Sequence, residues 1–175
     1  MQEIPAGVRE YLSTTDSLYR AEVAQRYPDL QKALNDPATR KAVLDWLASD
    51  EAWDSANSGF TSNCLEFLRA GATEGEAQIV RGFLLHPEPQ VRLRAYEFLL
   101  TLYFPDKNRE AMFLLLHGML SDNDDMVRAQ AARYIERANA VAELRDFLQR
   151  WYKTASDRGW AGTESFELVE RLLNS

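Results

Sequence analysis

The stretch "HPEPQVRLRAYEFLL", residues 86–100, joins a helix-breaking half to a strongly amphipathic helix. A similar stretch, "DNDDMVRAQAARYI", occupies residues 122–135. At a common offset of 36 residues the matched pairs are Val91 and Val127, Arg92 and Arg128, and Ala95 and Ala131. Because one offset covers both a turn and the helix after it, the pattern predicts a repeat of two helices joined by a tight turn. Such a helical pair cannot bury its apolar faces alone and must stack on neighbours.

Helix-start signals of the same kind recur along the rest of the chain. They are Asp16, Asp36 with Pro37, the box from Thr73 to Glu76, Pro89, Asp106, Asn123 or Asp124, and Thr163 or Ser165; Asn139 predicts a turn. No segment alternates apolar and polar residues at strand spacing. The sequence therefore predicts an all-α protein. Residues 49–63 predict either a surface loop or two short helical turns.

The segments "LLHPEPQVRLRAYEFL" and "MLSDNDDMVRAQAARYI" resemble HEAT-type (armadillo-type) repeats, in which Val-Arg and small residues follow the turn. The resemblance implies a right-handed α-α superhelix, a short solenoid of antiparallel helix pairs whose second helices line a concave groove. In that family the arginine commonly bonds an acidic residue about six positions earlier. Asp122 fits this role for Arg128. His86 holds that position in the first repeat, which leaves Glu88 as a substitute partner for Arg92.

The expected organisation is a single helical domain of 175 residues. Residues 16–70 form N-terminal helices that are repeat-like at best. Residues 72–139 form the two HEAT-like repeats, and residues 140–175 form a closing helical pair.

The net charge of −7 argues against a nucleic-acid-binding surface, because such domains normally carry a basic excess. Residues 1–80 carry 7 basic and 13 acidic side chains, so they contribute about −6. Cys64 is the single cysteine, which excludes an intrachain disulfide. Neither a secretory signal nor a membrane-spanning run is recognisable, so we expect a cytoplasmic protein without membrane contact.

Few residues offer chemistry. His86 and His117 are the only histidines, and neither has a carboxylate at a recognisable motif spacing. We expect His86 in a turn, His117 at a helix–helix contact, and Cys64 as a small buried residue. The acidic run "SDNDDM" is better suited to capping a helix than to binding calcium, since it lacks the closing glutamate of an EF-hand. We expect no catalytic constellation, no metal site and no cofactor.

The second helix of each repeat presents the most informative side chains. A core row on the first of them comprises Val91, Ala95, Leu99 and Leu102. Another side carries Arg94, Glu97, Phe98 and Thr101, and the matching positions of the second repeat are Gln130, Arg133, Tyr134 and Arg137. These residues form either an ordinary solvated face or, as the resemblance implies, a partner-binding groove. Arginine with an aromatic residue favours the second interpretation.

Two functional hypotheses follow. The first is a non-catalytic scaffold that binds another protein in the groove, as a small bacterial adaptor, inhibitor or immunity-type protein. Its acidic N-terminal part would steer a basic partner. The alternative is a nucleic-acid-handling enzyme that resembles HEAT-like DNA glycosylases of alkylated bases; its candidate residues are Arg94, Arg133, Arg137, Tyr134, Trp151 and Asp157. The sequence leaves the oligomeric state open.

Overall fold

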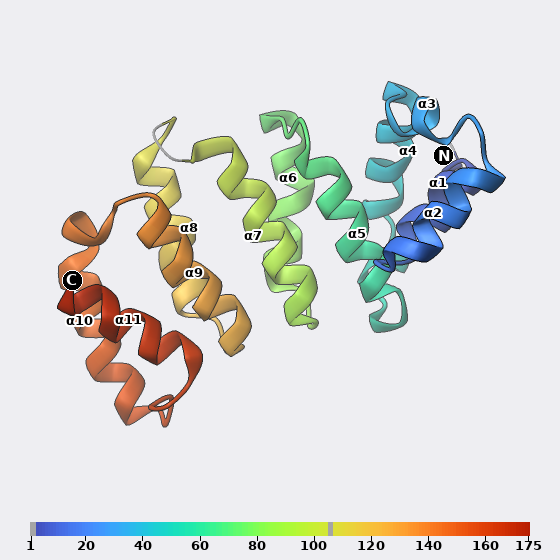
Figure 1. Cartoon of the computed structure of the whole chain (residues 1–175). Coiled ribbons are helices and arrows are strands. Elements are labelled where there is room, and N and C mark those ends of the chain that lie inside the picture. The colour runs from blue at the N-terminus through green and yellow to red at the C-terminus, as the bar shows by residue number, and fades with distance from the viewer. Residues whose placement is uncertain (1–2, 105–106) are drawn as a thin grey trace. The chain divides into compact units, whose positions relative to one another are not determined.

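The computed structural model of the chain describes residues 3–104 and 107–175 (Figure 1). Within those two ranges every regular element is a helix, so the prediction of an all-α protein is confirmed. The chain divides into two compact units, unit 1 (Met1–Thr101) and unit 2 (Leu102–Ser175).

Unit 1 is built of short helices that enclose a small apolar core. Its elements are α1 (Ala6–Leu12), α2 (Ser17–Arg26), α3 (Leu30–Leu34), α4 (Pro37–Leu47), η1 (Asp50–Trp53), η2 (Ser55–Asn57), α5 (Ser58–Arg69), α6 (Glu74–Gly82), η3 (Phe83–Leu85) and α7 (Pro89–Tyr103) up to Thr101. Helix α1 packs on α2, α3 and α5, and α4 packs on α5 and α6. Fully or almost fully buried side chains from these helices include Val8, Leu12, Val23, Val43, Leu47, Leu65, Leu68 and Val80.

The described part of unit 2 after α7 contains four helices of 11 to 17 residues. They are α8 (Arg109–Leu120), α9 (Asp125–Arg137), α10 (Val141–Asp157) and α11 (Glu164–Asn174). Helix α9 packs on both α8 and α11, and α10 packs on α11. The fully buried side chains of α8 and α9 include Met112, Leu116, Met119, Val127 and Ile135. The apolar positions of both helices recur every three or four residues, and this spacing buries one face of each.

The helix starts follow the local signals closely. Asp16 accepts hydrogen bonds from the N–H groups of Leu18 and Tyr19 and begins α2. Asp36 caps α4, whose first residue is Pro37. Further predicted caps are found at Thr73 with Glu76, Asp124 and Thr163. A carboxylate, hydroxyl or amide at these positions satisfies N–H groups that the first helical turn leaves without partners.

Three other local predictions have different outcomes. Asp106, expected to begin a helix, lies outside the described residues, and α8 begins after Asn108, which accepts a hydrogen bond from the N–H of Ala111. Asn139 has a φ of +49° and forms the turn between α9 and α10, as predicted. In residues 49–57 the second alternative holds, because η1 and η2 are two short helical turns. For residues 58–63 neither alternative holds, because they form the first half of the regular helix α5.

Arg40 ties the end of α5 to the start of α6. Its Nε and Nη2 atoms lie 2.6 and 2.7 Å from the two carboxylate oxygens of Glu76, which also accepts a hydrogen bond from the N–H of Thr73 at 3.0 Å. The same guanidinium donates to carbonyls at the end of α5, those of Leu68, Ala70 and Gly71. Burial acts to raise the pKa of Glu76, but the hydrogen bonds from Arg40 and Thr73 outweigh it, so the pKa is lowered.

Candidate functional site

Cys64 and the two histidines lie in apolar surroundings. Cys64, on α5, is completely buried, and burial raises the pKa of its thiol, so the thiol is protonated at neutral pH. His86 is 1% exposed, and its Nδ1 accepts a hydrogen bond from the N–H of Glu88. The ring of His117 stacks on Phe147 with 3.8 Å between centroids. Burial lowers the pKa of both histidines, which favours their neutral forms.

The aspartates of the "SDNDDM" run are occupied in local hydrogen bonds. Asp124 accepts from the N–H of Met126, and Asp122 accepts from the N–H of Asp124. Asp125 accepts from the hydroxyl of Ser165 at 2.6 Å and so joins α9 to the start of α11. Over the described ranges of the chain, no three His, Cys, Asp or Glu side chains gather in an arrangement that could hold a metal ion. The run acts in capping and helix packing, as its sequence suggested.

On α7, two of the predicted partner-binding residues belong to a ring of four charges. Arg94 lies 2.6 Å from Glu97 and 3.4 Å from Glu66 of α5. Arg69 lies 2.8 Å from Glu66 and 3.6 Å from Glu97, so each arginine contacts both carboxylates. Glu97 is 6% exposed. Because a buried carboxylate needs compensating charge, this ring holds α5 against α7.

The remaining residues of α7 divide between core and surface. Thr101 is exposed, and its hydroxyl donates to the carbonyl of Glu97 at 2.9 Å. Phe98, expected on the same side as Arg94, is completely buried, as are Val91 and Ala95. The sequence predicted that α7 has one buried face and one outer face. Because Phe98 is buried as well, the buried surface of α7 extends beyond the predicted core row.

On α9, the four matching residues share one face, which we call the α9 face: Gln130, Arg133, Tyr134 and Arg137. Arg133 donates to the side-chain oxygen of Gln130 at 3.2 Å and to Glu164 of α11. The exposed guanidinium of Arg137 lies 5.6 Å from the centre of the Tyr134 ring, which also contacts Phe104 edge-on. The seven predicted partner-binding residues therefore form two groups, three in unit 1 and four in unit 2.

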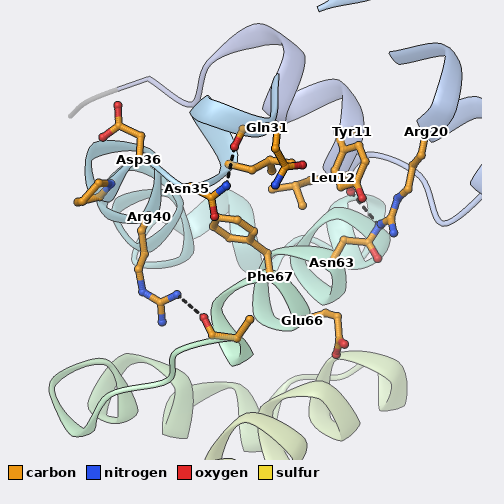
Figure 2. Close-up of a pocket in the computed structure, with 13 residues that line it drawn as sticks. Tyr11, Leu12, Arg20, Gln31, Asn35, Asp36, Arg40, Asn63, Glu66 and Phe67 are labelled. Carbon is orange, nitrogen blue, oxygen red and sulfur yellow. Dashed lines mark hydrogen bonds between the residues drawn. The ribbon is translucent and has the colours of Figure 1, made fainter. Parts of the chain in front are cut away.

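A feature of unit 1 that sequence reasoning missed is a cavity of about 550 Å³ (Figure 2). Helices α1 to α5 all contribute to it. Its lining residues include Tyr11, Arg20, Gln31, Asn35, Asp36, Arg40, Asn63, Glu66 and Phe67. Figure 2 shows Phe67 in the middle of the lining, with Arg20 and Asn63 on one side and Arg40 on the other.

The polar groups of this cavity are largely engaged with the protein itself. The guanidinium of Arg20 donates through Nε to the carbonyl of Thr14 and lies 4.7 Å from the centre of the Tyr11 ring. Asn63 donates to the carbonyl of Leu12 at 2.8 Å. Arg40 makes the contacts described above. These residues come from five helices at unrelated spacings, so no sequence motif could have identified the cavity.

No protein-family model matches the chain, and searches of curated proteins and of solved structures likewise find no match. None of the helices in the described ranges is long and apolar enough to cross a bilayer. The chain belongs to the class of all-helical proteins.

Proposed function

We propose that this chain is a non-catalytic helical scaffold that binds another protein, and that the α9 face forms part of its binding surface. The observation that carries the proposal is the pair of Tyr134 and Arg137 beside Arg133: the Tyr134 ring is half-buried, and the exposed guanidinium of Arg137 lies 5.6 Å from its centre. Tyrosine and arginine are enriched among the residues that dominate binding energy at protein interfaces.

The α9 face is also partly ordered before any partner arrives. Arg133 is held by Gln130 on its own helix and by Glu164 on α11, and Arg137 is oriented by the Tyr134 ring. Binding immobilises flexible side chains at an entropic cost, so side chains that are already held lose less on association. An Arg–Tyr pair with this geometry suits a partner segment that combines an apolar group with a carboxylate.

We further propose a HEAT-like solenoid, a right-handed superhelix in which α7 and α9 are the second helices of two repeats. The turn geometry of Arg92 and Arg128 supports this arrangement, because both arginines bond main-chain carbonyls of the turn that precedes their helix. In such a solenoid the α9 face would line the concave groove. A cytoplasmic adaptor, inhibitor or immunity-type role accords with this architecture.

The proposal is tested by affinity capture from native lysate at physiological salt with three forms of the protein. The wild type and the control Lys153→Ala, an exposed residue of α10, should retain the same partner. Y134A/R137A should lose it, and the purified pair should then bind at least about tenfold more weakly, or 1.4 kcal/mol. Recovery of no protein, or equal recovery with all three forms, would overturn the proposal.

The nucleic-acid alternative is separated from this one by a gel-shift assay at low salt. Of its candidate residues, Trp151 is 7% exposed and donates its indole N–H to the carbonyl of Leu120, so it serves the core of unit 2. The net charge of −7 also opposes phosphate contacts. We expect no retention of duplex DNA; retention that R133A and R137A abolish would favour the alternative instead.

A further inference from the structure

A small pocket of unit 2 combines aromatic rings with arginines. It has a volume of about 200 Å³ and is lined chiefly by Phe147, Arg150, Trp151, Thr154, Arg158 and Trp160. All lining residues come from α10, the segment after it and the end of α8, and none of those described is a carboxylate. The only charged groups among the described lining residues are thus two cations, although the protein has a net charge of −7.

The two arginines lie on one side of the last turns of α10. Arg150, Thr154 and Arg158 follow one another at intervals of four residues, a spacing that places side chains on one helix face. The guanidinium of Arg158 lies 5.1 Å from the centre of the Trp160 ring. Buried Arg128 contacts the same ring at 4.0 Å, so Trp160 is held from within the unit and orients Arg158 in turn.

Within the described ranges, neither pocket arginine is neutralised by a carboxylate of the protein. Elsewhere in unit 2 other arginines pair with carboxylates: Arg109 with Glu143, Arg128 with Asp125, Arg133 with Glu164, and Arg171 with Glu136. Among the residues that the structure describes, no carboxylate lies within ion-pair distance of Arg150 or Arg158. Their charges are therefore available to a ligand.

We propose that this pocket binds a phosphate monoester that carries a small aromatic or apolar group. A phosphate monoester bears a charge of about −1.5 to −2 at neutral pH, which matches two guanidinium groups, whereas a monocarboxylate would leave one of them unpaired. Arginine forks bond phosphate oxygens in pairs. The rings of Phe147 and Trp160 provide apolar contact for the rest of the ligand.

The volume limits the size of this ligand. The pocket is smaller than the cavities of about 300 Å³ or more that enclose drug-sized ligands. A phosphate with a single ring is therefore the appropriate scale for the part of the ligand that enters it. The ester could be a free small molecule or a phosphorylated side chain of a protein, since both present the same chemistry.

Binding is tested with phenyl phosphate as the first probe. The readout is the tryptophan fluorescence of the chain of 175 residues. Trp151 and Trp160 line the pocket, so occupation should change their emission. Phenyl phosphate should bind more tightly than benzoate, and phenol should not bind. Isothermal titration calorimetry gives an independent measure of each affinity. Equal affinity for benzoate and phenyl phosphate would overturn the assignment to phosphate esters.

Three substitutions separate a binding role from a structural one. R150A and R158A should each weaken phenyl phosphate binding by at least about tenfold. R158K should weaken it less, because it keeps the charge but loses the fork. The control K153A removes one positive charge from the same helix outside the pocket and should leave the affinity unchanged. Circular dichroism checks that each variant is folded.

The two arginines could instead serve only to stabilise α10. In that case R150A and R158A will lower the melting temperature, and phenyl phosphate will bind neither the wild type nor the variants. This result would show that the proposal is wrong. The source of the ester is decided by a second comparison. A short peptide with phosphotyrosine that binds, while its unphosphorylated form does not, indicates a modified protein. Binding of phenyl phosphate without binding of the peptide indicates a free small molecule.

Discussion

Arg92 and Arg128, 36 residues apart, hold the turns before their helices in the same way. Nη1 of Arg92 donates to the carbonyls of His86 and Pro87 at 2.9 and 2.8 Å. Nη1 of Arg128 donates to the carbonyls of Asp122 and Asn123 at the same two distances. Because both bonds reach main-chain oxygens, the geometry is preserved although one turn has histidine and the other aspartate six residues before the arginine.

Loss of Arg128 should destabilise the protein more than loss of Arg92. Arg128 is 2% exposed and also bonds Ser165 and Asp125, which join α9 to α11. We expect R128A to lower the free energy of unfolding by about 3 kcal/mol and R92A by about 1–2 kcal/mol. Urea denaturation followed by circular dichroism measures both. Equal losses would show that the additional bonds of Arg128 contribute nothing to stability.

Arg40→Ala should be strongly destabilising, because it removes the guanidinium that donates to Glu76 and to three carbonyls at the end of α5. The expected loss is about 2–3 kcal/mol, since the guanidinium is only partly buried. The matched control is Lys41→Ala on the same helix. The exposed ion pair of Lys41 with Asp45 should contribute at most about 0.5 kcal/mol to the free energy of unfolding. A loss in R40A no greater than that in K41A would contradict this role.

His86 should make stability depend on pH below about pH 6.5, the ordinary pKa of histidine. Burial lowers the pKa of His86 in the folded protein. A hydrogen bond to the main chain of Ala52 acts to raise this pKa but offsets the effect of burial only in part. Below about pH 6.5 the unfolded chain binds a proton that the folded chain does not, so the free energy of unfolding falls as the pH decreases. Above that pH the contribution is constant.

His86→Asn is the corresponding test, because asparagine keeps an acceptor for the N–H of Glu88 and does not titrate. We expect the difference in unfolding free energy between pH 7.5 and pH 5.5 to be smaller in H86N than in the wild type. Denaturant titrations at the two pH values measure it. An unchanged difference would assign the pH dependence to other groups.

Arg150 should influence the titration of His117. The pKa of His117 is lowered chiefly by burial and secondly by the charge of Arg150. We expect R150A to raise this pKa while leaving it below the ordinary value of about 6.5, because burial remains. NMR titration of the ring protons measures the change, and K153A is the charge-matched control. An identical pKa in wild type and R150A would mean that Arg150 lies too far away or is too well solvated to act.

Much of the helical framework was predictable because its signals act over a few residues. Asp16, Asp36, Thr73, Asp124 and Thr163 cap helices where expected, since a side-chain oxygen there reaches N–H groups two or three positions later. The helices α1 and α3 were not predicted, and neither was the start of α5 at Ser58. Helices α1 and α3 are short, and packing against neighbouring helices stabilises them more than local propensity does.

The candidate sites were predictable only in part. The spacing of Gln130, Arg133, Tyr134 and Arg137 placed them on one face of a helix, and the structure brings them together there. The same reasoning placed Glu97 on an outer face. It is buried because α5, whose charged residues have no sequence relation to α7, supplies Arg69 beside it.

By itself the sequence determined that the chain is helical, where most helices begin, and that two turns are built alike. These properties depend on hydrogen bonds and apolar spacing within a few residues. Only the tertiary structure decided which charges are neutralised and which cavities exist. The contact of Arg40 with Glu76 and the pocket between Arg150 and Trp160 depend on which helices pack together, and packing is set by the fit of whole apolar surfaces.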